Sequence, residues 1–218
     1  MILRGVKFGT YHTASEWGFI LNEKTIEPPT PKIVTVPVDG RDGALDLSEA
    51  LTGEIKYENR KASFTFLITE GTYSDREWII QTVYSVIHGR KLNIILDDNT
   101  LYYLVGRCAI TSVTNNNAYG SITIEADCEP YKYSIYETVR TIEATATATE
   151  YFLLNGGVKT VVPTLTVTGT VNIKYGNSSA SLSEGEYILT DLLLKSGETL
   201  IEVEGSGTLK VAYREGIL

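Results

Sequence analysis

The alternation of apolar and polar positions along the chain predicts a protein that is mainly β-structure. Residues 62–68 are rich in aromatic and branched side chains, as strands are. Residues 92–96 and 101–105 are two apolar runs around an Asp-Asp-Asn-Thr turn, which is typical of a hairpin. A second hairpin is predicted over residues 108–128, where apolar residues recur at every second position on both sides of a polar turn.

The second hairpin can be given a register from its two apolar stripes. Placing Cys108 opposite Cys128 and Ile110 opposite Ala126 puts both stripes on one face, as a buried sheet face requires. In this register the two cysteines are buried free thiols, which behave as small apolar side chains. A reactive cysteine needs a positive and exposed setting, so we expect no reactive pair here.

One segment has helical rather than strand periodicity. Ile79, Val83 and Ile87 recur at intervals of four, which predicts a helix over about residues 74–88. Ser74 or Asp75 is expected to cap its start, and Gly89 suits its end. The apolar stripe is expected to pack this helix against the sheet.

The last third of the chain predicts a second, smaller unit. Short alternating strands are expected at 163–168, 171–175, 185–189, 199–203 and 208–213, with Gly169-Thr170 and Gly205-Ser206-Gly207 as turns. Such spacing is typical of an antiparallel sandwich. Both Trp, both His and both Cys lie before residue 141, so we expect domains at 1–140 and 141–218. The stretch 140–150 is either a linker or the first strand of the second domain.

The charge balance limits the partners of the chain. Its 218 residues include 27 acidic and 19 basic ones, which gives a formal net charge of −8. A chain this acidic is a poor candidate for coating nucleic acid, which needs Lys and Arg to replace counterions. There is no apolar run of about 18 residues, so no membrane-spanning helix is expected.

Catalytic, metal and cofactor signals are weak. The sequence has no phosphate-binding glycine loop, no Cys-x-x-Cys and no His-Glu-x-x-His. His12 and His88 lack an implied nucleophile partner, so a catalytic triad is not expected. The acidic stretches 97–99 and 39–43 can be read as calcium ligands or as turns, and we favour turns. We therefore predict no catalytic residue, no metal and no cofactor.

Three groups of segments, taken in order, resemble one family. They are Val36–Gly53 with Tyr57–Arg60; Ile87–Lys91 with Leu96–Asp98, Tyr102–Tyr103 and Gly106–Arg107; and Pro163–Gly169 with Gly205–Gly207 and Tyr213–Leu218. Together they resemble the distal tail (Dit) proteins of long-tailed phages that infect Gram-positive bacteria. The resemblance spans nearly the whole chain.

The resemblance implies an architecture and a role. It implies an N-terminal β-sandwich with one helix, similar to tail-tube proteins, and a C-terminal galectin-like antiparallel β-sandwich. Six copies would form a ring at the tail tip of the virion, made in the bacterial host cytoplasm. Implied partners are the tail tube protein, a tail-associated lysin or fibre protein, and receptor-binding or baseplate proteins. Genome DNA would pass through the channel without specific binding, no membrane is involved, and the family is not enzymatic.

Within this picture the polar stretch from Pro37 to Arg60 is expected to reach a neighbouring subunit. A polar loop this long is usually functional. Arg41 can pair with a carboxylate of the next copy or, equally, with one of its own chain. The candidate contact residues are Asp39, Arg41, Asp42, Asp46, Tyr57 and Arg60. The proline-rich residues 27–32 are either an arm towards a neighbour or the approach to a strand.

Two other classes of function stay open at this point. Fourteen tyrosines and a β-sandwich fit a stand-alone carbohydrate-binding module, although tyrosine is also ordinary in β-proteins. A glycosidase or peptidase rests only on the abundant carboxylates. The structural reading predicts a discrete oligomer, the lectin reading predicts glycan affinity, and the enzyme reading predicts an activity lost with one carboxylate.

Overall fold

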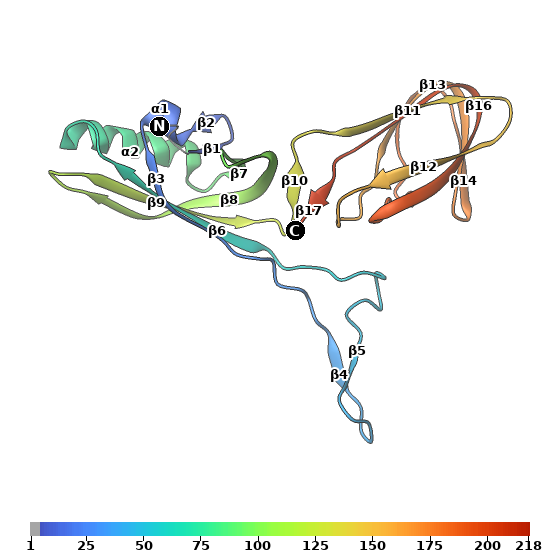
Figure 1. The fold of residues 1–218 in the computed structure, drawn as a ribbon, viewed down its shortest axis with the longest axis horizontal. Coiled ribbons are helices and arrows are strands. Elements are labelled where there is room, and N and C mark those ends of the chain that lie inside the picture. Colours follow the sequence, from blue (N-terminus) through green and yellow to red (C-terminus); the bar gives the residue numbers. More distant parts are fainter. Residues whose placement is uncertain (1–4) are drawn as a thin grey trace. The chain divides into compact units, whose positions relative to one another are not determined.

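The computed structural model describes residues 5–218, which form two compact units (Figure 1). The first unit ends at Lys132 and also includes Leu218; the second runs from Tyr133 to Ile217. Antiparallel sheets dominate both units, which confirms the predicted fold class. The division lies before the boundary predicted near residue 140, because the strand that begins at Thr138 already pairs with the last long strand of the chain.

The first unit is one antiparallel sheet with two helices. Its elements are β1 (Val6–Phe8), β2 (Tyr11–His12), α1 (Thr13–Trp17), β3 (Ile20–Ile26), β4 (Thr35–Pro37), β5 (Ala44–Asp46), β6 (Arg60–Ile68), α2 (Tyr73–Ile87), β7 (Lys91–Leu96), β8 (Asn99–Asn115) and β9 (Gly120–Cys128). The strand order across the sheet is β2-β1-β7-β8-β9-β6-β3. The strands β4 and β5 pair only with each other.

The long helix α2 packs on this sheet, as its apolar stripe predicts (Figure 1). Ile80, Val83 and Ile87 are buried in the same core as the phenylalanines of β1 and β6. The helix is capped by Thr72, not by Ser74 or Asp75. The Thr72 hydroxyl accepts from the Asp75 N–H, and the Asp75 carboxylate accepts from the Thr72 N–H, which is a capping box. None of the helices in residues 5–218 is long and apolar enough to span a membrane.

The hairpin β8–β9 exists, but the predicted register is wrong by two residues at its base. Cys108 lies opposite Ala126, and Cys128 lies opposite Gly106. The register already differs by one residue beside the turn, where Asn115 lies opposite Gly120. A bulge between Ile110 and Ser112 places one extra residue in β8 and makes the difference two at the base. Gly106 fits opposite Cys128 because a Cβ there would lie 2.5 Å from the Cys128 Sγ atom. Both apolar stripes still face one core, and both thiols are buried and free.

The second unit is built around two long strands. Its sheet contains β11 (Thr138–Ala144), β12 (Thr149–Asn155), β13 (Thr164–Tyr175), β14 (Ser178–Leu182), β15 (Gly185–Ile188) and β16 (Gly197–Tyr213). The short strands β10 (Lys132–Ser134) and β17 (Gly216–Ile217) lie at the two ends of this stretch of chain and pair with each other. The strands β13 and β16 pair along almost their whole length. On the outer side of β16 lie β11 and β12, and on the outer side of β13 lie β14 and β15. The stretch 140–150 therefore holds strand residues and is not a linker.

The two glycine segments expected as turns lie instead inside these long strands. Gly169 pairs with Gly207 in an unbroken ladder, and Gly205 pairs with Val171. Gly169, Gly205 and Gly207 have φ values of 84°, 142° and 151°. These backbone conformations let the two strands bend together, so that both halves of each strand face one apolar core. The predicted Gly169-Thr170 and Gly205–Gly207 turns are therefore wrong.

Candidate functional site

The most distinctive feature of the first unit is a ribbon between β3 and β6, here called the arm (residues 27–59). It begins as a continuation of these two strands, because the Glu27 N–H donates to the Lys61 carbonyl at 2.9 Å. Farther out, the Lys32 N–H donates to the Lys56 carbonyl at 2.7 Å, and β4 pairs with β5. Figure 1 shows the arm as a narrow hairpin that extends from the end of β3 and returns to the start of β6. The stretch Pro37–Arg60, predicted as a polar loop, thus consists mostly of turns and irregular segments, and only a short ribbon of β4 and β5 is regular β-structure.

One face of the arm is apolar and exposed. Val36 lies directly opposite Leu45, so the two share a face. The Leu47 N–H donates to the Val34 carbonyl at 2.8 Å, which continues the same register. Side chains on the other face include Thr35 and Asp46. An isolated two-stranded ribbon is marginally stable in water, so an apolar face of this kind needs a partner surface to cover it.

Sequence reasoning missed this face, although its signal is present. Valine recurs at positions 34, 36 and 38, and leucine at 45 and 47, which is strand alternation on both sides of a glycine-containing turn. The prediction concentrated on the charged residues between them.

The tip of the arm carries Asp39, Arg41 and Asp42, all exposed. The Arg41 N–H donates to the Val38 carbonyl at 3.2 Å, which closes the turn. In residues 5–218 no ion pair joins Arg41 to a carboxylate, so the intrachain salt bridge considered from the sequence is absent. The side chains at the tip are therefore available to another molecule.

Asp46 is already used within the arm. Its Oδ1 atom accepts from the Ser48 hydroxyl at 2.5 Å and from the Ser48 N–H at 2.9 Å. These two hydrogen bonds hold the pKa of the Asp46 carboxyl below its usual value. Asp46 thus fixes the turn after β5, which its pattern in the sequence did not reveal.

Tyr57 and Arg60 lie at the base of the arm, far along the ribbon from its tip. Tyr57 forms a bridge with Pro31, and its ring packs edge-on against Tyr131 with centroids 6.1 Å apart. Arg60 is only 3% exposed, and its Nη2 donates to the Pro130 carbonyl. Of the six predicted contact residues, the structure thus groups Asp39, Arg41 and Asp42 at the tip and leaves Arg60 buried.

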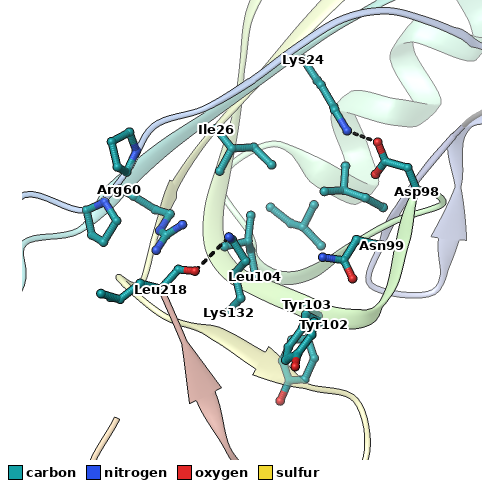
Figure 2. A pocket seen from close by; sticks show the side chains of 14 residues that line it. Lys24, Ile26, Arg60, Asp98, Asn99, Tyr102, Tyr103, Leu104, Lys132 and Leu218 are labelled. Atoms are coloured by element: carbon teal, nitrogen blue, oxygen red, sulfur yellow. Dashed lines mark hydrogen bonds and ion pairs between the residues drawn. The ribbon is translucent and has the colours of Figure 1, made fainter. Parts of the chain in front are cut away.

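A cleft of about 610 Å³ adjoins the base of the arm (Figure 2). Its lining includes Pro28, Pro29, Tyr102 and Tyr103. Its charged side chains are Lys24, Arg60, Asp98 and Lys132. Sequence reasoning missed this cleft because its lining comes from strands that only the sheet brings together.

Within residues 5–218, no ion pair joins Arg60 or Lys132 to a side-chain carboxylate. Lys24 pairs with Asp98, whereas Lys132 donates to the main-chain oxygen of Leu218 at 3.0 Å. Within residues 5–218, the Arg60 Nε atom is buried with no hydrogen-bond partner. Burial lowers the pKa of Arg60. The pKa of Lys132 is lowered mainly by burial and also by the nearby positive charge of Arg60. The cleft therefore has excess positive charge in an apolar setting.

The other titratable candidates have structural partners. His12 accepts from the Ser15 N–H through Nδ1 and lies 3.0 Å from the Asp97 carboxylate through Nε2. Asp97 also accepts from the Gly5 N–H at 2.7 Å. The His88 Nδ1 accepts from the Ile110 N–H at 3.0 Å. In the described part of the chain, no group of three or more His, Cys, Asp or Glu residues is placed to hold a metal ion.

The fold was compared with known proteins and structures. No protein-family model matches the sequence, and no curated protein matches it. The crystal structure of SPP1 Dit (gp 19.1), a hub adsorption apparatus protein of phages infecting Gram-positive bacteria, matches with a TM-score of 0.70. The identity is 14%, over 97% of this chain and 98% of that one. The phage p2 baseplate in its activated conformation gives a TM-score of 0.47 at 8% identity, over 96% of this chain and 98% of that chain. The chain therefore has the fold of a Dit protein, as its motifs predict.

Proposed function

We propose that this protein is a structural subunit of the distal end of a long phage tail, or of a phage-derived tail. The observation that carries the proposal is the likeness in fold to SPP1 Dit over both units. In this role the chain has no catalytic residue. It forms a hub that links the tail tube to the proteins of host adsorption.

The arm supports an assembly of several copies. Its apolar face is exposed in a single chain, and its tip carries unpaired charges. A contact of the arm with a different surface of the next copy is heterologous, and such contacts close into rings when the rotation is right. We propose a ring of six copies in the virion, with DNA passing through its channel without specific binding.

The second unit supports a docking role. Phe152 of β12 lies directly opposite Leu200 of β16, and both are largely exposed on the outer face. Exposed aromatic and aliphatic side chains in contact are typical of protein interfaces. We propose that this galectin-like unit binds tail-associated, baseplate or receptor-binding proteins by such apolar contact.

The arm's role is tested by comparing its two faces. Val36→Asp places a charge on the apolar face, and Thr35→Asp places the same charge on the opposite face. Light scattering after size exclusion, over a range of concentrations, measures the mass of each variant. We expect the wild type and Thr35→Asp to form a discrete oligomer and Val36→Asp to remain monomeric. An oligomer that survives Val36→Asp would refute the role of the arm.

A further inference from the structure

The arm is acidic and the cleft is basic, and within residues 5–218 no ion pair joins the charges of the arm tip, or Arg60 and Lys132 of the cleft, to a side chain of opposite charge. The arm contains seven acidic and three basic residues. At its tip, no other part of the chain lies within 4 Å of a Cβ built on Gly40 or Gly43. The tip is therefore a narrow turn whose residues 38–43 are all exposed among the residues that the structure describes.

The cleft offers the complementary surface. Within the described part of the chain, no ion pair joins Arg60 or Lys132 to a side-chain carboxylate, and Pro28, Pro29 and Tyr102 line the same cleft. Unpaired charge in an apolar setting is costly and favours a ligand that brings carboxylates. A cleft of about 610 Å³ accommodates a tight turn but not a folded domain.

We propose that the tip of the arm, residues 38–43, inserts into the cleft of a second copy of this chain. Asp39 and Asp42 would lie near Lys132 and Arg60, and the apolar face of the arm would continue over the prolines of the cleft. This inference rests on the proposed assembly role of the arm and adds the surface that receives it. The contact is heterologous, because the tip of one copy meets the cleft of the next.

Charge reversal tests the pairing. Lys132→Glu and Asp42→Lys should each raise the protein concentration at half-assembly at least tenfold, because each brings like charges together. The combined variant should restore assembly towards the wild-type value. Lys61→Glu, an exposed lysine on β6 outside the cleft, is the matched control and should leave assembly unchanged. Thermal unfolding of every variant separates a lost contact from a damaged fold.

Crosslinking between two variants tests the placement directly. Protein with Asp42→Cys is mixed with protein carrying Lys132→Cys under oxidising conditions. We expect a covalent dimer in the mixture and not in either protein alone. The native thiols are buried and do not interfere. In the control mixture, Lys61→Cys replaces Lys132→Cys and should give little dimer.

The outcomes separate this inference from the broader proposal. No dimer, or an equal yield with Lys61→Cys, overturns the placement in the cleft, as does a double reversal that fails to restore assembly. If Val36→Asp still abolishes the oligomer in that case, the arm contacts a neighbour at another surface. If Val36→Asp and charge reversal both leave the oligomer intact, the assembly role of the arm fails as well.

Discussion

Arg76 shows how a single residue fixes one end of the first unit. This arginine of α2 is 2% exposed, and all three of its nitrogens donate. Nε donates to the Asn115 side chain at 3.1 Å, Nη1 to the Gly71 carbonyl at 2.6 Å, and Nη2 to the Asn116 carbonyl at 2.5 Å. It therefore joins the start of the helix to the β8–β9 turn.

We expect Arg76→Lys to lower the free energy of unfolding by about 2–4 kcal/mol. The single ammonium group of lysine cannot reach all three acceptors that the planar guanidinium of Arg76 contacts. A buried charge that has lost hydrogen bonds is costly. Urea denaturation followed by circular dichroism measures the change. Arg90→Lys is the control, because Arg90 is exposed and donates to the Ser85 carbonyl, and it should change stability by less than about 0.5 kcal/mol. Equal effects of the two changes would contradict this role.

The two thiols predict a pH dependence. Burial raises the pKa of Cys108 from 9.0 to about 12. The pKa of Cys128 is raised to about 11, mainly by burial and also by the nearby negative charge of Asp127. The unfolded thiols lose protons from about pH 9 while the folded ones keep theirs. The contribution of the thiols to stability is therefore complete below pH 9 and is lost as the pH rises towards the folded pKa values.

Urea denaturation at pH 8 and pH 10.5 tests this expectation. The wild type should lose more stability between the two pH values than the variant Cys108→Ala/Cys128→Ala. The same difference in both proteins would show that other groups cause the loss. Below pH 9, a thiol reagent should react with the wild type only as fast as it unfolds.

At the scale of elements, the bends of β13 and β16 depend on glycine. A Cβ on Gly207 would lie 1.9 Å from the Thr168 carbonyl oxygen, and the φ of Gly207 is 151°. We expect Gly207→Ala to destabilise the second unit by about 3 kcal/mol or more, because strain and a backbone clash combine. Thermal unfolding measures the effect.

A matched glycine in a turn provides the control for this bend. Gly176 has a φ of 54° with no other group within 4 Å of its Cβ position, so Gly176→Asn should cost about 1 kcal/mol or less. If Gly207→Ala destabilises the protein as little as Gly176→Asn does, the close approach of the two strands does not require glycine at position 207.

These elements also show what the sequence can reveal. The helix α2 and the strands β6 to β9 follow from periodicity, because their buried faces repeat at regular intervals. A glycine within such a pattern is ambiguous, since it permits a turn between two strands or a bend inside one. Only the partner strand decides, and Gly207 faces Gly169 across the ladder. The bulge after Ile110 is equally invisible to a count from the turn.

The candidate site was predicted only in part for the same reason. The charged tip of the arm could be named because Asp39, Arg41 and Asp42 are adjacent in sequence. The cleft could not, because Lys24 lies on β3, Asp98 in the turn between β7 and β8, and Lys132 on β10, and only the fold brings them together. The burial of Arg60, which is 3% exposed at the edge of the cleft, could not be predicted either, because burial depends on packing and not on residue type.

At the scale of the whole molecule, net charge limits contact with DNA. With a formal charge of −8, the chain repels phosphate at long range. We expect no binding of a fluorescent DNA duplex in anisotropy measurements at about 150 mM salt and little at 20 mM. Binding that weakens steeply with salt would show a concentrated basic surface and contradict passive passage of DNA.

The base of the arm has a consequence for the size of any assembly. Three prolines, at positions 28, 29 and 31, and the Tyr57–Tyr131 pair stiffen the point where the arm leaves the sheet. When an arm reaches from each copy to the next, the number of copies needed to complete a circle depends on the angle at which it leaves. These few residues then set that angle, and with it the number of copies in the assembly. A small change there would alter the diameter of the ring, or turn it into an open spiral, while leaving every contact surface intact.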